Sequence, residues 1–152
     1  DTPVPTEEIT PAGWVPVEVP EAGIGFSVPS DWHALGDAEW GAPNRISTRI
    51  GVHWVRTDAD WEPKSMIPRD AEVMLHLTPN VGWGQGDFYH IQRFDTPGYE
   101  YHTVVRRANA NLAYDFYAVT DTLNGLEAIE EVHFKFVRSA KLRPIEITPG
   151  EE

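Results

Sequence analysis

The sequence predicts an α+β fold in which a mostly antiparallel sheet of about six or seven strands is flanked by two main helices. Three runs of alternating residues follow one another from Gly86 to Thr120, with short turns between them. Strands joined by such turns pair antiparallel. The next stretch, Gly125–Val137, is amphipathic with the period of an α-helix. Together these observations favour an α+β sandwich, a sheet with helices packed against it.

Length and composition suit a single domain. The chain has 152 residues, of which 41% are hydrophobic and 11% aromatic. A domain of this size buries about 70% of its unfolded surface, so it forms a full core without disulfides or metals. We expect a Pro/Thr/Glu-rich tether over 1–13, one domain over 14–142, and an acidic tail over 143–152.

The N-terminal third of the domain reads as short strands. Val15–Val19 alternates apolar and polar residues, and its prolines place it at a sheet edge. Ile24–Val28 alternates again, and Trp32 opens another short strand. A loop rich in Gly, Ala and Pro, Gly36–Asn44, leads into the long alternating run Arg45–Arg56, which predicts a long strand.

The middle of the chain is ambiguous. Thr57–Lys64 reads as an acidic loop. The following stretch, Ser65–Leu77, ends in alternating aliphatic residues that would suit a strand. However, Pro68 suits the first turn of a helix, and Asp70 and Glu72 suit its positive N-terminal end. We therefore predict a helix here.

The last third carries the strongest periodicities. Phe88–Phe94, Tyr99–Arg107 and Leu112–Val119 each alternate, and bulky apolar groups occupy both faces. Both faces of the sheet are therefore expected to be covered. In the helix that follows, Ile129 and Phe136 lie on the apolar stripe and are expected to be buried.

Charge and cysteine content exclude several functions. The chain has 12 Lys and Arg against 24 Asp and Glu, a net charge of −12, and no cysteine. Such a surface repels phosphate backbones, which argues against nucleic-acid binding, and it suits cationic partners or divalent cations. The absence of cysteine excludes disulfides, thiolate metal sites and cysteine nucleophiles. No apolar run is long enough for a transmembrane segment.

The N-terminal segment bears on localisation. Asp1–Gly13 contains three prolines, three threonines and two glutamates, a composition typical of a flexible tether. A tether after a removed signal or a lipidated residue would place the domain outside the cytoplasm, secreted or lipid-anchored. The alternative is a frayed N-terminus of a cytosolic protein.

Three short motifs resemble a known family. Gly23–Trp32 resembles the G-F-x-F-x-x-P-x-x-W opening of PsbP-like domains, which include the photosystem II extrinsic oxygen-evolving protein and its bacterial lipoprotein relatives. The Phe94–Gly98 turn and the closing Phe136–Leu142 fit the same order, and the resemblance covers about residues 14 to 142. It implies an α-β-α sandwich, an extracytoplasmic location and a binding or assembly role without catalysis. No functional residue carries over, because the lysine-rich contact surfaces of the photosynthetic members have no counterpart in this acidic chain.

Histidines are the candidates for catalysis. The six are His33, His53, His76, His90, His102 and His133. None forms H-x-x-x-H or H-E-x-x-H, so a zinc-protease site is excluded. His90 and His102 lie at similar distances from a turn, and they either pair across strands or act independently. His133 lies on the apolar stripe of the helix and suits a core-edge histidine with one hydrogen bond. An enzyme using histidine and carboxylate groups in a cleft is the alternative to a binding domain.

A group of carboxylates in one loop is a candidate cation site. Asp58, Asp60 and Glu62 lie close together in one loop. Calcium prefers six to eight oxygen ligands, but the spacing lacks the central glycine of an EF-hand. If the predicted helix runs back beside the long strand, Asp95 and Asp121 would join them at one end of the sheet. The alternatives are a divalent-cation site and a solvated acidic loop.

The other end of the sheet is the expected partner-binding surface. Trp40 and Trp83 lie in Gly-rich loops, and Arg106 and Arg107 lie near a strand end. The tryptophans either cap the core or form, with the arginines, a patch of the kind enriched at protein interfaces. We expect at least one indole to be exposed and the partner to be a protein.

Overall fold

The computed structural model describes residues 13–36, 38–43, 45–57, 60–67, 69–80, 85–94, 98–107, 111–121 and 123–143, with the side chains of 45–47 and 123–128 left out. In chain order the elements are β1 (Trp14–Val19), the short 3₁₀ helix η2 (Pro20–Ala22), β2 (Ile24–Pro29), β3 (His33–Gly36), β4 (Glu39–Ala42), β5 (Arg45–Arg56), the 3₁₀ helix η3 (Pro63–Met66), β6 (Ala71–Leu77), β7 (Gly86–Arg93), β8 (Tyr99–Arg107), β9 (Leu112–Thr120), α1 (Leu123–Ser139) and β10 (Lys141–Leu142).

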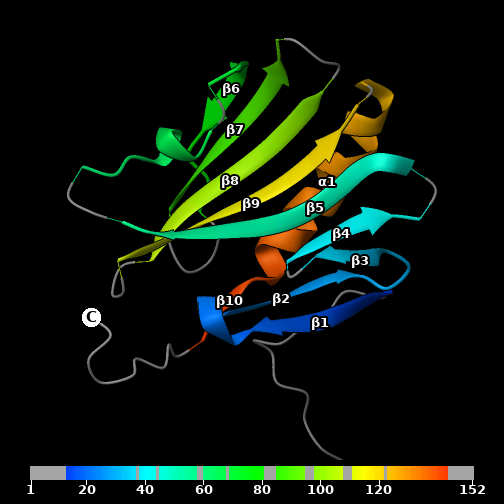
Figure 1. Cartoon of the computed structure of the whole chain (residues 1–152), viewed down its shortest axis with the longest axis horizontal. Helices are drawn as coiled ribbons and strands as arrows, with labels where there is room; N and C mark the ends of the chain where they lie inside the picture. The colour runs from blue at the N-terminus through cyan, green and yellow to red at the C-terminus, as the bar shows by residue number, and fades with distance from the viewer. Residues whose placement is uncertain are drawn as a thin grey trace, which may run out of the picture.

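Two antiparallel sheets organise the chain (Figure 1). The larger has seven strands in the order β3-β4-β5-β9-β8-β7-β6, and the smaller has three in the order β1-β2-β10. The predicted mostly antiparallel sheet is thus confirmed. Strands β6 to β9 form a meander because consecutive strands are joined locally, whereas β5 reaches β9 across the intervening sequence.

The predicted helix over Ser65–Leu77 is wrong. Its first residues belong to η3, and its second half is the edge strand β6, paired with β7 from Ala71↔Arg93 to Leu77↔Phe88. The alternating aliphatic residues decided the outcome, because backbone pairing with β7 outweighs the weaker helix-start signals. Within the described residues the sheet is therefore flanked by one α-helix instead of two.

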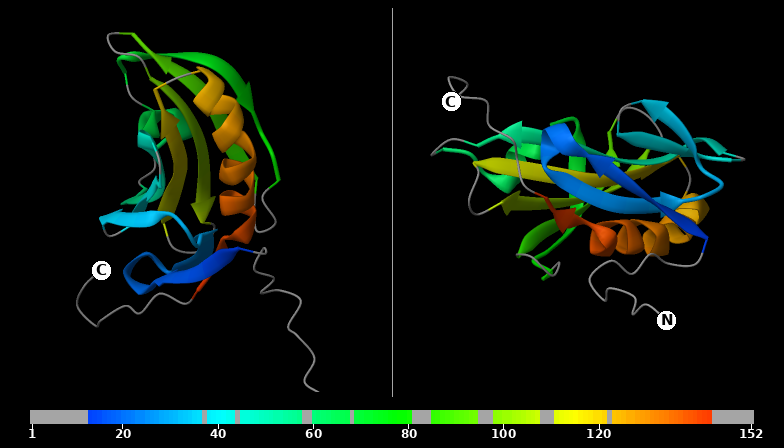
Figure 2. Two further views of the ribbon diagram at one scale, coloured as in Figure 1. Left: turned by 90° about the vertical axis from the view of Figure 1, so that its right-hand side faces the viewer. Right: turned by 90° about the horizontal axis from the view of Figure 1, so that it is seen from below.

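The C-terminal helix is confirmed. Helix α1 includes the whole predicted stretch Gly125–Val137 and extends it at both ends. Ile129 and Phe136 are buried, as expected. The helix crosses one face of the large sheet, packing on β9, β8 and β2 (Figure 2). Within the residues that the structure describes, no helix has both the length and the hydropathy to span a bilayer.

The main core lies between the large sheet, α1 and the small sheet. Phe26 of β2 contacts Phe136 of α1 and Trp40 of β4, with ring centroids 5.0 and 5.6 Å apart. Phe116 of β9 contacts Phe136 at 5.6 Å, and all three contacts are edge-to-face. Such contacts contribute beyond the area that they bury. They join the two sheets and the helix into one hydrophobic unit.

The opposite face of the large sheet, which we call the open face, carries a smaller cluster. Ile67 packs there against three buried residues of β7 and β8, and Trp61 and Met66 lie against the same cluster. The segment around η3 therefore covers the β7–β8 part of this face. The expectation that both faces are covered is therefore met on this face only in part, since His53 and Val55 of β5 are exposed.

The strand register overturns the predicted grouping of loops at the sheet ends. Strand β5 runs antiparallel to β9, with Arg56 opposite Leu112. The chain after β5 therefore starts beside Asn111, whose carbonyl oxygen accepts a hydrogen bond from the Thr57 amide at 2.8 Å. Asp121 follows β9 at the other end. The acidic loop and Asp121 consequently do not share the predicted neighbourhood.

Candidate functional site: an ionic network on the open face

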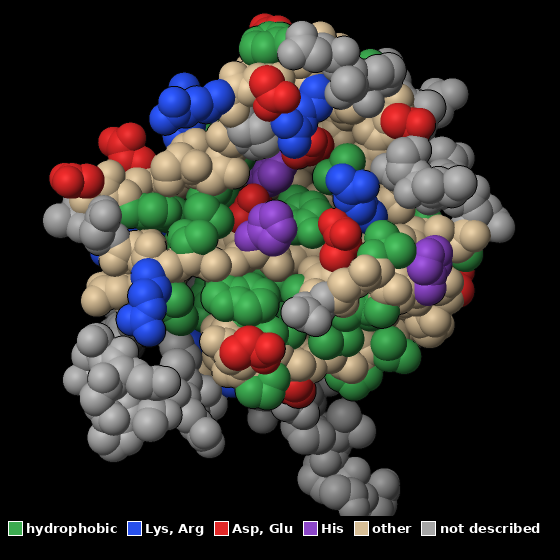
Figure 3. All heavy atoms as spheres, in the orientation of Figure 1, with side chains coloured by type: hydrophobic (Ala, Val, Ile, Leu, Met, Phe, Trp, Pro, Cys, Tyr) green, Lys and Arg blue, Asp and Glu red, His purple; other side chains and the backbone are tan. Residues whose placement is uncertain are grey.

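Strand alternation sends a set of polar side chains to the open face. Tyr101 and Thr103 of β8 face α1, so Glu100 and His102 point the opposite way. In β9, Asp115 and Tyr117 likewise alternate with the core residue Phe116. Figure 3 views this face and shows histidine and acidic side chains gathered near its middle.

His102 lies between two carboxylates. Its Nδ1 donates to the Oδ2 and Oδ1 atoms of Asp115 at 2.8 and 2.9 Å, and its Nε2 donates to Glu100 Oε1 at 2.6 Å. All three residues are buried. Because a carboxylate only accepts, the arrangement requires a proton on both ring nitrogens, which is the imidazolium form.

The network continues to the sheet edge through an arginine. Glu100 uses its second oxygen, Oε2, to accept from Arg93 Nε at 2.6 Å. Arg93 Nη1 donates in turn to Asp70 Oδ1 at 2.7 Å. The chain Asp70–Arg93–Glu100–His102–Asp115 thus links the start of β6 to β7, β8 and β9.

Charge states follow from the geometry. Burial alone lowers the pKa of His102, but the charge of Asp115 and the hydrogen bonds to both carboxylates outweigh it and raise the pKa to about 9. Burial raises the pKa of Glu100, yet its hydrogen bonds to His102 and Arg93 bring the net pKa below the ordinary value. At neutral pH the network therefore holds its charges.

Tyr117 extends the polar face toward β4 and β5. Its hydroxyl donates to Glu39 Oε2 at 2.7 Å, and burial together with Glu39 raises the pKa of the phenol. The ring lies 4.8 Å from the exposed His53 ring. Gly51, opposite Tyr117, has no room for a side chain, since a Cβ there would lie 2.6 Å from the Ala38 carbonyl oxygen.

A groove of about 440 Å³ lies beside the network. It is lined by Val52, His53, Trp54, Val55, Met66 and Asp115. Asp115 belongs to both the groove and the network. His53 is the histidine among the residues that line the groove.

The chemistry of His102 suits a structural role. Both ring nitrogens carry protons held by carboxylates, so this histidine does not accept a proton at neutral pH. A general base must have an atom free to accept the proton that it removes. Neither ring nitrogen of His102 is free, because each is bonded to a carboxylate. Removing one partner of a buried ion pair is costly, because the other charge is left buried and unpaired. The network therefore ties β7, β8 and β9 in one register.

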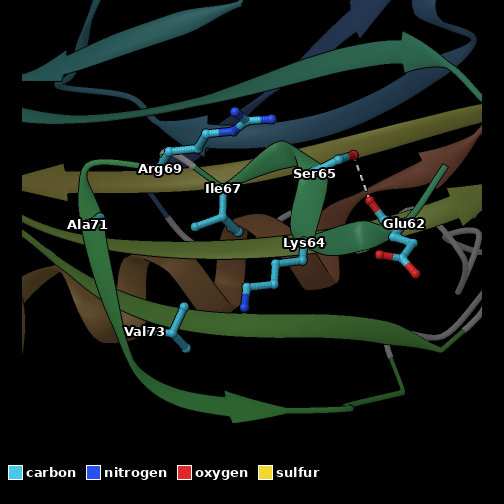
Figure 4. A pocket seen from close by; sticks show the side chains of 7 residues that line it. All are labelled: Glu62, Lys64, Ser65, Ile67, Arg69, Ala71 and Val73. Atoms are coloured by element: carbon cyan, nitrogen blue, oxygen red, sulfur yellow. Dashed lines mark hydrogen bonds between the residues drawn. The ribbon is translucent and has the colours of Figure 1, made fainter.

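A second pocket, of about 570 Å³, lies between η3 and β6 (Figure 4). Ile67 and Val73 contribute apolar surface, and Lys64 and Arg69 are its two cations. In Figure 4 Lys64 extends toward Val73, whereas Arg69 extends away from it. Because the two cations diverge, the pocket lacks a convergent pair for an anion.

The predicted aromatic patch is divided by the structure. Trp40 is 9% exposed and packs against Phe26 in the core. Its strand neighbour Ile50 lies opposite Ala118, near the end of β9 that is remote from Leu112. Trp83 lies outside the described residues. The expectation of an exposed indole therefore rests on Trp83 alone.

The two arginines of that patch have different positions. Arg107 Nη1 donates to the Gly23 carbonyl at 2.9 Å, and Nη2 donates to the Arg143 carbonyl at 2.7 Å. It thereby links β8 to one end of the β2–β10 pair, where Gly23 and Arg143 lie side by side. Arg106 is exposed.

The predicted cation ligands are not brought together in the described part of the chain. Asp58 and Asp95 lie outside it. Asp60 and Glu62 follow β5, and Asp121 follows β9 at the opposite sheet end. Among the described residues, no group of three or more His, Asp or Glu side chains has the arrangement of a metal site.

The structure also shows the positions of His90 and His133, for which the sequence left alternatives open. His90 lies opposite Tyr101, and His102 lies opposite Tyr117 and Tyr89, so the two histidines occupy opposite faces and act independently. His133 is buried with Nε2 at 2.8 Å from Thr103 Oγ1, which confirms one hydrogen bond but places it fully in the core. Burial lowers the pKa of His133 to about 3, and the nearby charge of His102 adds to this.

Sequence reasoning missed the Glu100–His102–Asp115 network. One signal was present, because Glu100, His102 and Asp115 occupy the interior of strands rich in aromatic and β-branched residues. A charged residue in such a place is rarely buried unless it is paired. The pairing itself depends on the β8–β9 register.

Comparison with known proteins identifies the fold. No protein-family profile matches the sequence, and no curated protein sequence matches it. The structure is similar to cyanobacterial PsbP (CyanoP) from Synechocystis sp. PCC 6803, with a TM-score of 0.62 over 88% of this chain and 95% of that chain, at 12% identity. The chain has the PsbP-like fold.

Two further structures resemble this PsbP-like fold. LpqN of Mycobacterium tuberculosis, involved in cell envelope biogenesis, matches with a TM-score of 0.60 and 11% identity, over 86% of this chain and 91% of that chain. A protein of Bacteroides thetaiotaomicron VPI-5482 matches with a TM-score of 0.56 and 11% identity, over 85% of this chain and 48% of that one. At these identities the likeness is one of fold.

Proposed function

We propose that this chain is a noncatalytic extracytoplasmic domain, secreted or lipid-anchored, that binds or assembles other proteins. The PsbP-like fold carries the proposal, because it extends over nearly the whole length of CyanoP and of LpqN, and LpqN is involved in cell envelope biogenesis. A location outside the cytoplasm also suits the composition of residues 1–13, which predicts a tether.

The character of the open face supports a binding scaffold. Its most concentrated group of titratable side chains, Glu100, His102 and Asp115, is buried and mutually bonded. The groove beside it offers His53 and mostly apolar side chains. This arrangement favours a structural role, in which the network stabilises the sheet, and not a catalytic role in which it transfers protons to a substrate.

Partner contacts are proposed at exposed residues of the predicted patch. Arg106 is exposed near the end of β8, and we propose it and Trp83, which lies outside the described residues, as contact residues. Arg107 would support the surface from within, since it bonds to the small sheet, whereas Trp40 lies in the core near the other end of β9 and takes no part in this contact. The net charge of −12 favours a partner with a basic surface.

The test is capture from the envelope fraction of the source organism. The immobilised chain is expected to retain a discrete basic protein that free chain displaces and that salt weakens. Arg106→Ala should reduce retention, because it removes the side chain of a proposed contact residue, whereas Lys135→Ala, the same change of charge on the exposed side of α1, should not. Retention of cytosolic proteins alone would contradict the proposal. Turnover of a small molecule that His53→Ala abolishes would favour the enzyme alternative.

A further inference from the structure

Strand β6 is an edge of the seven-stranded sheet. It pairs with β7 along one side, and in the described chain no strand lies along its other side. An edge strand presents unpaired backbone donors and acceptors to any segment that can extend the sheet. The other edge of the same sheet is the short strand β3.

Large aliphatic side chains are exposed along β6. Met74, Leu75 and Leu77 are 51%, 46% and 51% exposed, whereas Leu35 on β3, 49% exposed, is the one large hydrophobic residue that is exposed on that edge. Leu75 and Leu77 lie opposite His90 and Phe88, which places them on the same face of the sheet as α1. Exposed apolar groups on a free edge mark a site for strand pairing.

The surroundings of this edge are rich in carboxylates. Asp70 and Glu72 lie at the start of β6, and Asp87 bonds to His76 near its end, at 2.9 Å. On the α1 side, the charge of Glu130 acts on the neighbouring His90. The half-buried Arg93 pairs with Asp70, and the exposed cations Lys64 and Arg69 line the pocket between η3 and the start of β6.

We propose that the β6 edge, defined by Ala71–Leu77, binds an extended segment of a partner protein in which aliphatic residues alternate with lysine or arginine. The segment adds as an eighth strand, with its aliphatic side chains against Leu75 and Leu77 and its cations near the carboxylates. A second copy of this chain fits less well, because it would bring the same acidic residues together. The inference rests on the proposed function in protein binding and adds a second contact surface to the one proposed at Arg106.

The test uses a blocked heptapeptide, Lys-Val-Lys-Val-Lys-Val-Lys, matching the seven residues of β6. Titration of the full chain should give saturable binding, and amide exchange should slow at β6. The double variant Leu75→Ser/Leu77→Ser should weaken binding about tenfold or more, because it removes apolar contact. Leu35→Ser, at the opposite edge, is the matched control and should leave the affinity unchanged. Replacing the peptide's lysines with glutamate should abolish binding.

The inference would be overturned if the heptapeptide did not bind, or if the double variant bound it equally well. It would also be overturned if amide exchange slowed on an element other than β6, or if the chain formed a dimer that the double substitution dissociates. If the double variant is unstable, slowed exchange at β6 in the unmodified chain decides the matter. Capture of an envelope partner that persists in the double variant would refute the β6 site and leave the proposed function standing. Loss of all capture by the unmodified chain would refute the proposed function itself.

Discussion

The two faces of the large sheet each hold a buried histidine, and the two have opposite charge states. His133 lies between α1 and the sheet, with one hydrogen bond to Thr103 and no partner for Nδ1 among the described residues. His102, next in the chain to Thr103, lies on the open face between two carboxylates. The pKa is about 3 for His133 and about 9 for His102. Burial alone therefore does not determine the charge of a histidine, because the partners present at the site decide it.

The same contrast separates the two faces as a whole. The α1 face is closed by apolar side chains, so a neutral histidine is tolerated there as one more ring in the packing. The middle of the open face is held by charges that compensate one another. The α1 face should therefore respond mainly to lost volume, and the open face mainly to lost charge.

The largest effect is expected on the apolar face. Phe136→Ala should lower the free energy of unfolding by about 3–5 kcal/mol, because it removes a fully buried ring from the contact of both sheets and α1. Equilibrium unfolding in urea measures it. Phe94→Ala, at an exposed position, is the control and should change little. Equal effects of the two variants would show that α1 does not close this core.

On the open face, His102→Ala should lower the free energy of unfolding by about 3 kcal/mol, near the lower end of the range for a broken buried ion pair. Asp115 loses its partner, whereas Glu100 keeps Arg93. His76→Ala is the matched control, since its hydrogen bond with Asp87 is partly exposed and should contribute under about 1 kcal/mol. An unchanged free energy of unfolding in His102→Ala would contradict a tightly paired network.

The pH dependence of stability should have opposite signs for the two histidines. The pKa of His102 rises from 6.5 to about 9 on folding, so its contribution is complete below 6.5 and is lost as pH rises through about 9. The pKa of His133 falls from 6.5 to about 3, so its unfolded form takes up a proton first and stability drops as pH falls below 6.5. Glu100, whose pKa is lowered, adds to the acid loss.

Histidine NMR titrations and urea unfolding between pH 3 and about 10 check this expectation. His102→Ala should flatten the alkaline decline, and His133→Phe the acid one. Titration of both rings near their ordinary pKa would remove the contrast between the two faces.

The smallest expected effect concerns calcium. Because the register separates Asp60 and Glu62 from Asp121, we expect saturating calcium to leave the melting temperature unchanged. Thermal unfolding with calcium and with chelator measures this. A stabilisation that chelator reverses and that Asp60→Asn removes would show that the loop after β5 binds the cation.

The sequence by itself determined the elements with strong local periodicity. The strands between Gly86 and Thr120 and the helix that follows were predictable because alternation and an apolar stripe are properties of neighbouring residues. Short turns between the strands determined their order in the meander for the same reason. The burial of Ile129 and Phe136 followed directly from the stripe.

Tertiary structure alone decided the remainder. Whether 71–77 became a strand depended on β7 as a pairing partner. Whether His102 met Asp115 depended on the β8–β9 register, since a shift by one residue exchanges the two faces. Trp40 entered the core because β4 packs across from β2. Each outcome is set by contacts between residues on different elements, and local sequence patterns do not contain the energies of those contacts.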